Sequence, residues 1–148
     1  MVSANPSRPE PRGRDAYRHF TNITTRWADN DAYGHVNNTI YYQWFDSAVN
    51  ELLVGAGLLD IAHGDPIGLV VETGCTYFAP LSFPGDVEVG LAVDRLGGSS
   101  VTYRIGIFAA GADAPAAQGH FTHVYVSRST RRPVALPDQW RAKLDVLV

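Results

Sequence analysis

One long apolar helix, early in a chain that is otherwise rich in strands, most constrains how this sequence can fold. From Ile40 onward, apolar side chains recur at the spacing of a single helix face; they are Tyr41, Trp44, Phe45, Ala48, Leu52 and Leu53. Asn37 or Asn38 can cap the helix start, because an Asn side chain accepts from the free N–H groups of a first turn. Gly55 and Gly57 supply the stop. The spacing therefore predicts a helix of about 16 to 18 residues.

The segments around this helix alternate apolar and polar residues with the two-residue period of β-strands. We expect strands over 17–27, 67–78, 87–94, 101–107 and 117–125, and a short terminal helix over 137–147. Gly97-Gly98 indicates a hairpin, and residues 111–115 make another turn. Because tight turns join antiparallel neighbours, these strands are expected to form an antiparallel meander.

A single apolar helix and an antiparallel sheet must cover one another, because neither can bury its apolar face alone. We therefore predict an α+β domain in which a curled antiparallel sheet of about five strands is wrapped around one long central helix. Such a sheet leaves its edges and its outer face partly uncovered. Pairing with a second copy of the chain would cover them, so a homodimer is expected.

Length and composition limit the class of protein. The 148 residues suffice for one domain with a real core, which we place at residues 17–148. Residues 1–16 are rich in proline and arginine and lack an apolar segment, which predicts a disordered tail rather than a secretory signal. The formal charge of −3 and the absence of a long apolar run argue against nucleic-acid and membrane partners. The single cysteine, Cys75, excludes an internal disulfide and agrees with a cytoplasmic location.

The residues with chemical potential gather in the loop before the long helix. Asp29, Asp31, Gly34 and His35 precede the Asn37-Asn38 pair. A carboxylate near a helix N-terminus stays ionised, because free N–H groups and the helix dipole favour negative charge. The same N–H groups can stabilise the oxyanion that forms when an acyl carbonyl is attacked. The pattern therefore predicts an acyl-transfer active site in this loop.

The string Asp31-x-x-Gly34-His35-Val36-Asn37-Asn38-x-x-Tyr41 resembles the motif of hotdog-fold thioesterases of the 4-hydroxybenzoyl-CoA thioesterase family. The pairs Pro80…Gly85-Asp86 and Pro133…Leu136-Pro137 follow in the family's order, so the resemblance spans about residues 20–140. It implies the hotdog fold, with active sites at the interface of a homodimer that often pairs into a homotetramer. It also implies hydrolysis of an acyl-CoA substrate, with no cofactor and no metal.

The same resemblance assigns roles to residues of the loop. The catalytic carboxylate falls on Asp31, as nucleophile or as general base for water. The backbone N–H that polarises the thioester carbonyl falls near Asn38. His35 is either functional or a structural hydrogen-bonding residue. Gly34 is expected to take a positive φ, either to let the substrate approach closely or only to form a turn.

Two departures from the resemblance matter. Plant acyl-carrier-protein thioesterases use an Asp and a His four residues apart, which Asp31 and His35 match. Their intervening Asn is Tyr33 here, so that version of the mechanism is in doubt. The family also tends to carry an Arg in the helix where this chain has Val49.

Several other residues have two readings. Tyr41 belongs to the core or lines an acyl pocket. Arg128 and Arg131 grip the phosphates of coenzyme A or form a solvated basic loop. Asp29 more simply orders the loop, and Cys75 is a small buried residue rather than a nucleophile.

A metal site is not expected from the histidines of the last strand. His120 and His123 lie three residues apart on a predicted strand, so they point to opposite faces and cannot share a metal.

The leading hypothesis is an acyl-CoA thioesterase. The alternatives are an acyl-carrier-protein thioesterase and a non-catalytic hotdog domain that binds acyl thioesters. Asp31 favours an enzyme, because a binding module has no need of a carboxylate at that point.

Overall fold

The computed structural model describes residues 8–148. Within them lie β1 (His19–Thr24), α1 (Asn38–Gly55), β2 (Ile67–Tyr77), β3 (Asp86–Leu96), β4 (Ser100–Ala109), β5 (Ala117–Val126) and α2 (Asp138–Asp145). Each predicted strand and both predicted helices are present. The first strand is shorter than predicted, because the chain turns into a 3₁₀ helix at Trp27–Asp29 that the Asp29 carboxylate caps.

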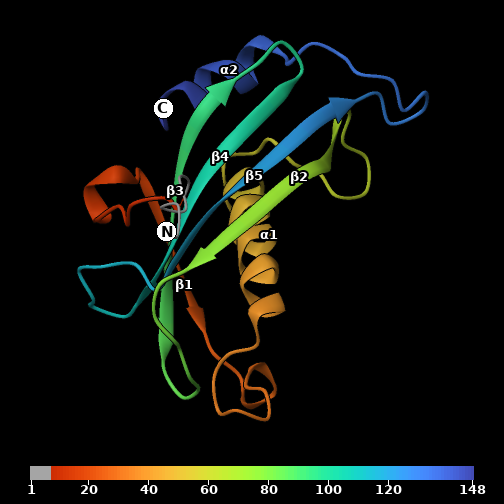
Figure 1. Ribbon diagram of the computed structural model, residues 1–148. Coiled ribbons are helices and arrows are strands. Elements are labelled where there is room, and N and C mark those ends of the chain that lie inside the picture. The colour runs from red at the N-terminus through yellow and green to blue at the C-terminus, as the bar shows by residue number, and fades with distance from the viewer. Residues whose placement is uncertain (1–7) are drawn as a thin grey trace, which may run out of the picture.

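The strands form one antiparallel sheet in the order β1-β3-β4-β5-β2 (Figure 1). β1 and β2 are therefore its two edges. The predicted meander holds only for β3, β4 and β5, because β2 pairs with β5 at the far edge and the chain then crosses to β3. The sheet curls, and α1 lies against its concave face (Figure 1). β2 contains a register shift between Val70 and Glu72, which is typical of a β-bulge at Val71.

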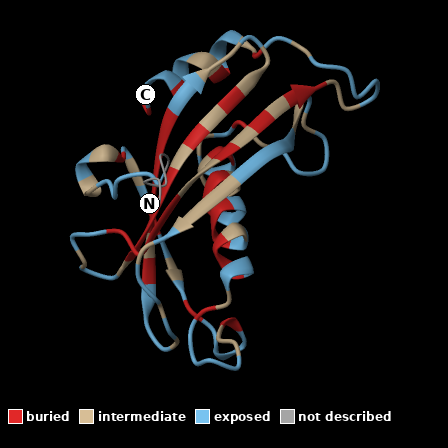
Figure 2. Cartoon of the chain, in the orientation of Figure 1, coloured by how far each residue is buried: buried red, intermediate tan, exposed pale blue. Residues whose placement is uncertain are grey.

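The core lies between α1 and the sheet (Figure 2). The alternation in β3 was predicted correctly, because Val87, Val89, Leu91 and Val93 are all buried on the helix side. Phe45 of α1 is fully buried against them. The opposite side of α1 stays exposed, as at Gln43, Asp46, Ser47 and Glu51. The sheet therefore covers one side of the helix rather than enclosing it.

The N-terminal segment corrects the prediction of a disordered tail up to residue 16. Gln118 is buried, and its two amide atoms require partners. Its Oε1 accepts from the backbone N–H of Arg12 at 2.9 Å, and its Nε2 donates to the carbonyl of Glu10 at 2.9 Å. Arg14 packs over the Phe108 ring and pairs with Glu88 at 3.1 Å. The segment from residue 8 is thus held on the outer face of the sheet, and residues 1–7 lie outside the described part.

Across residues 8–148, neither α-helix has the length and apolar character needed to span a bilayer.

Candidate active site

Asp29 fixes the loop that precedes α1. Its side chain is 1% exposed, and its carboxylate accepts from the Arg26 backbone N–H at 2.8 Å and from the Arg26 guanidinium at 2.7 Å. Its carbonyl oxygen accepts from the Asn37 N–H at 2.8 Å. Asp29 therefore joins the beginning of the loop to the start of the helix, which confirms that it orders the loop.

Between these anchors the chain makes a tight turn over residues 31–35. The Asp31 N–H donates to the His35 carbonyl at 2.8 Å, and the Gly34 N–H donates to the Asp31 carbonyl at 3.1 Å. Gly34 has a φ of +80°, the predicted left-handed conformation that side chains rarely adopt. The turn sets the position of Asp31 relative to His35.

Residues 81–83 support this turn from the side. The Ser82 hydroxyl donates to the Gly34 carbonyl at 2.9 Å, and the Phe83 N–H donates to the Asn30 side chain at 3.0 Å. These contacts could not be predicted from local sequence patterns, because they join loops about fifty positions apart. They hold the turn from a second direction.

The Asp31 carboxylate remains available for chemistry. One of its oxygens accepts from the Tyr33 N–H at 2.9 Å. None of the ion pairs found in residues 8–148 involves it. A partly exposed carboxylate without a cationic partner keeps a lone pair for a proton or for a carbonyl carbon.

The start of α1 leaves one backbone donor free. The N–H groups of Val36 and Asn37 donate to carbonyls of neighbouring loops, and those of Thr39 and Ile40 donate to Asn37. The Asn38 N–H lies between them and has no acceptor among the described residues. At a helix N-terminus such a donor also carries the positive end of the helix dipole. It is therefore suited to stabilise an oxyanion.

A cleft of about 320 Å³ opens at this helix start. Its lining brings together His35, Asn38 and Tyr41 with the residues that follow β2. The Tyr77 hydroxyl donates to the Asn38 carbonyl at 2.7 Å. The rings of Tyr77 and Tyr41 pack edge to face, with 4.9 Å between their centroids. Asp31 does not line the cleft itself, but its turn ends at His35, which does. The sequence did not point to Tyr77.

Tyr41 is 3% exposed and belongs to the core, as one of its two predictions states. It also lines the cleft. Burial raises the pKa of Tyr41 to about 12, so the hydroxyl stays protonated at neutral pH.

The two arginines predicted to bind phosphate lie away from this cleft. The Arg128 guanidinium donates to the carbonyls of Gly64 at 2.5 Å and Ile61 at 3.2 Å. It thereby ties down the connection between α1 and β2. Arg131 is exposed in a turn with a φ of 61°. Neither side chain joins His35 and Asn38 within the same chain.

The remaining candidates are placed as follows. His123 is buried, whereas His120 lies on the outer face with its ring 3.1 Å from Glu72, so the predicted opposite orientation is confirmed. Burial raises the pKa of Cys75 to about 11, which leaves a protonated thiol and a poor nucleophile at neutral pH. Residues 8–148 contain no group of three side chains placed to hold a metal ion.

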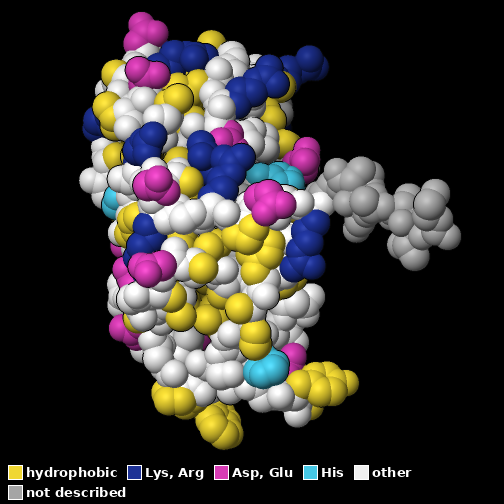
Figure 3. Space-filling view, turned by 60° about the vertical axis from the view of Figure 1, so that its left-hand side comes forward, with side chains coloured by type: hydrophobic (Ala, Val, Ile, Leu, Met, Phe, Trp, Pro, Cys, Tyr) yellow, Lys and Arg dark blue, Asp and Glu magenta, His cyan; other side chains and the backbone are white. Residues whose placement is uncertain are grey.

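The surface offers two further features. Hydrophobic side chains project at the lower end of the molecule in Figure 3, the end formed by the loop before α1 in Figure 1. Trp27 and Tyr33 of that loop are 80% and 87% exposed.

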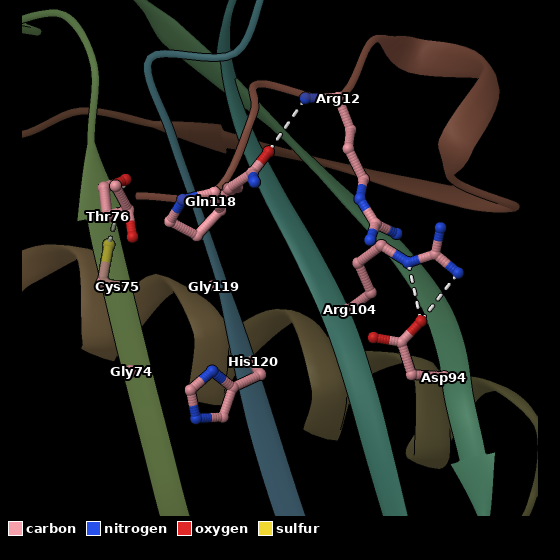
Figure 4. A pocket seen from close by; sticks show the side chains of 10 residues that line it. Arg12, Gly74, Cys75, Thr76, Asp94, Arg104, Gln118, Gly119 and His120 are labelled. Atoms are coloured by element: carbon pink, nitrogen blue, oxygen red, sulfur yellow. Dashed lines mark hydrogen bonds and ion pairs between the residues drawn. The ribbon is translucent and has the colours of Figure 1, made fainter. Parts of the chain in front are cut away.

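A polar cleft of about 340 Å³ lies on the outer face of the sheet (Figure 4). There Arg104 of β4 pairs with Asp94 of β3 at 2.8 Å, and Gln118 accepts from the Arg12 N–H of the N-terminal segment.

Comparisons with known proteins agree with this fold. The family model described as thioesterase-like superfamily matches residues 25–144. The PA5185 protein of Pseudomonas aeruginosa is 51% identical with a TM-score of 0.90, covering 93% of this chain and 96% of that one. The putative thioesterase PA2801 of Pseudomonas aeruginosa is 31% identical with a TM-score of 0.77, covering 84% and 95%.

A 1,4-dihydroxy-2-naphthoyl-CoA thioesterase from Synechocystis shares the fold at 21% identity, with a TM-score of 0.77 and coverage of 85% and 94%. No curated protein sequence matches the chain. The family model spans most of the domain and includes the Asp31 loop, α1 and all strands from β2 onward. The chain therefore belongs to the thioesterase-like superfamily, and the predicted hotdog-fold thioester hydrolase is confirmed at that level.

Proposed function

We propose that this protein hydrolyses the thioester bond of an acyl-CoA to a free carboxylic acid and CoA. The observation that carries the proposal is the Asn38 N–H at the start of α1, which has no acceptor within residues 8–148 and follows the turn of Asp31. The thioesterase name of a structural neighbour, which acts on 1,4-dihydroxy-2-naphthoyl-CoA, supports the choice of an acyl-CoA.

Two routes are consistent with this geometry. In one, an Asp31 oxygen attacks the carbonyl carbon and the CoA thiolate leaves; water then hydrolyses the resulting anhydride and restores the carboxylate. In the other, Asp31 removes a proton from water as that water attacks, and the proton passes to the departing thiolate. Both develop an oxyanion, and one backbone donor is worth on the order of 10²–10³ in rate in acyl-transfer enzymes. Asn38 would supply it.

The other residues of the cleft have supporting roles in this proposal. Gly34 keeps its side of the turn free of a side chain, so that the thioester can approach. His35 lines the cleft and would orient the carbonyl or the thiol, and Tyr41 would pack against the substrate. Arg128 and Arg131 remain candidates for the CoA phosphates only through a second subunit, since they lie away from the cleft of their own chain.

A substrate panel tests the proposal. Purified protein is offered acyl-CoA esters with short, long and aromatic acyl groups, and thiol release is followed. We expect turnover of at least one ester. Binding of acyl-CoA without release of thiol would instead support the non-catalytic alternative. Turnover of an acyl-carrier-protein ester in preference to its CoA counterpart would support the carrier-protein alternative.

We further propose that the enzyme works as a homodimer joined through β2. Among residues 8–148 no strand pairs with the outer side of this 11-residue strand, and its Leu69, Val70 and Val71 are 39%, 47% and 59% exposed. A long apolar edge is a template for pairing with another strand. Antiparallel pairing of two copies of β2 would extend the sheet and leave both helices on one side. Assembly into a homotetramer and a cytoplasmic location remain predictions.

Val71→Lys is expected to give a monomer of 16.1 kDa where the parent protein runs at twice that mass. A charge on a free sheet edge opposes strand pairing, which is why natural proteins place Lys on such edges. Light scattering after gel filtration gives the mass. Val146→Lys serves as the control, since Val146 is 73% exposed but follows α2 and lies away from β2. A dimer that persists in the Val71 variant would contradict this interface.

A further inference from the structure

A second cavity of about 380 Å³ lies on the helix side of the sheet, at the opposite end of α1 from the Asp31 turn. Leu53, Leu59 and Trp140 give it an apolar wall. His123 and Tyr125 of β5 also line it. Gly68 faces both rings, and a Cβ there would lie only 3.1 Å from His123. Asn50 and Arg128 add further polar groups to the lining. The cavity thus combines an apolar wall with several polar side chains.

Two of these polar side chains have an atom with no partner within the described chain. His123 is 3% exposed and Tyr125 is 1% exposed, yet neither the His123 Nδ1 nor the Tyr125 hydroxyl makes a hydrogen bond to residues 8–148. Buried polar atoms are nearly always hydrogen-bonded, so unpaired atoms in the wall of a cavity point to a ligand. The Tyr103 hydroxyl is buried nearby and also has no hydrogen-bond partner among residues 8–148.

Both groups are uncharged at neutral pH. Burial lowers the pKa of His123 to about 4 and raises that of Tyr125 to about 12. A neutral imidazole offers one donor and one acceptor, and the phenol offers one of each. They therefore suit a ligand that offers a hydroxyl or carbonyl oxygen.

The cavity cannot serve the Asp31 turn of its own chain. At a rise of about 1.5 Å per residue, Leu53 lies about 22 Å along α1 from Asn38. The distance becomes short between two subunits if their β2 strands pair in antiparallel fashion about the midpoint, Glu72. Ile67, beside the cavity, then lies opposite the partner's Tyr77 at a strand spacing of about 5 Å. Since Tyr77 contacts Asn38, the cavity of one subunit then adjoins the cleft of the other.

We propose that this cavity receives the acyl group of the thioester held at Asp31 of the partner subunit, and that His123 and Tyr125 select an acyl group that ends in a hydrogen-bonding oxygen. The inference rests on the proposed thioesterase function and on the β2 dimer. The cavity has a volume of about 380 Å³ and an apolar wall beside its polar groups. The favoured acyl group therefore has an apolar body and a terminal hydroxyl or keto oxygen.

The first test compares hexanoyl-CoA with 6-hydroxyhexanoyl-CoA. We expect the native enzyme to favour the hydroxylated ester in kcat/KM by about tenfold, the scale of one hydrogen bond, and Tyr125→Phe to bring that ratio close to one. Tyr17→Phe is the matched control, because the Tyr17 hydroxyl is also buried without a partner but lies outside this cavity. Equal kcat/KM for the two esters, or a preference that survives in Tyr125→Phe, would overturn the inference.

A binding measurement separates this inference from the proposed function. Calorimetry with the two non-hydrolysable thioether analogues of these esters reports selection by the cavity without turnover. Preferential binding of the hydroxylated analogue, lost in Tyr125→Phe, would uphold the inference even if no ester were hydrolysed and the proposed function had failed. Hydrolysis of the esters without that binding preference would support the proposed function and contradict the inference.

The second test asks whether one site draws on two subunits. Asp31→Asn removes the carboxylate, and Leu59→Trp fills the cavity from a loop whose backbone can adjust. If the two subunit types mix at random, half of the dimers are hybrid, and each hybrid has one site with both an intact carboxylate and an open cavity. Co-refolding the two inactive variants should thus restore about a quarter of the native activity. No recovery, with hybrid dimers shown by mass spectrometry, would refute the shared site.

Discussion

Asp31→Asn is expected to lower kcat for acyl-CoA hydrolysis by about 10²-fold or more, the scale of an essential acid–base group. The amide keeps the size of the side chain and its acceptor for the Tyr33 N–H, so the turn should persist. It cannot attack a carbonyl as an anion or remove a proton from water. The loss should therefore appear in kcat, with little change in the affinity for substrate.

The control for this variant is Asp113→Asn, which removes an exposed carboxylate in the turn between β4 and β5. Its kcat is expected to match that of the native enzyme. Unfolding curves and binding of a thioether analogue check that both variants remain folded and bind ligand. Full turnover by Asp31→Asn on the best ester of the panel would remove Asp31 from the mechanism.

Gly119→Ala is expected to destabilise the fold by about 3 kcal/mol or more, a large effect for one methyl group. A Cβ at this position would lie 2.1 Å from the Gly74 carbonyl oxygen and 2.7 Å from the Phe45 ring. The oxygen belongs to the neighbouring strand β2, so β2 and β5 would have to move apart to remove the clash. The ring belongs to α1, so the helix would have to move as well.

Urea denaturation measures this loss, and Gly55→Ala is the matched control. A Cβ on Gly55 meets nothing within 4 Å, and alanine is the better helix former by about 1 kcal/mol. The control should be as stable as the native protein or slightly more so. If the free energy of unfolding of the Gly119 variant lies within about 0.5 kcal/mol of the native value, the prediction is wrong. The sheet would then accommodate the added methyl group at little cost.

Elements that depend on local pattern were predictable from the sequence. The period of α1 and the alternation Val87, Val89, Leu91, Val93 each identify a buried face without knowledge of the neighbours. Long-range pairing was not predictable, because nothing in the composition of β2 says that it pairs with β5 rather than with β3, which follows it in the chain. The N-terminal segment shows the same limit, since Gln118, which holds it, lies about a hundred residues away.

The same distinction between local and long-range features applies to the candidate site. Asp31, Gly34, His35 and Asn38 could be singled out because they occupy one short loop at the start of one helix. Tyr77 could not, since only the folded sheet brings its hydroxyl to Asn38. The sequence does not mark His123 as a residue of a cavity. The cavity that it lines forms only when β5, α1 and α2 pack together.

The single extra residue in β2 has a consequence for how such an enzyme can diversify. Before Val71 the even-numbered positions of the strand face the helix, as Gly68 and Val70 do; after it the odd-numbered positions do, as Cys75 and Tyr77 do. The two halves of one strand thus follow independent inward patterns. Evolution can therefore reshape the end that lines the His123 cavity while the end that contacts Asn38 stays as it is.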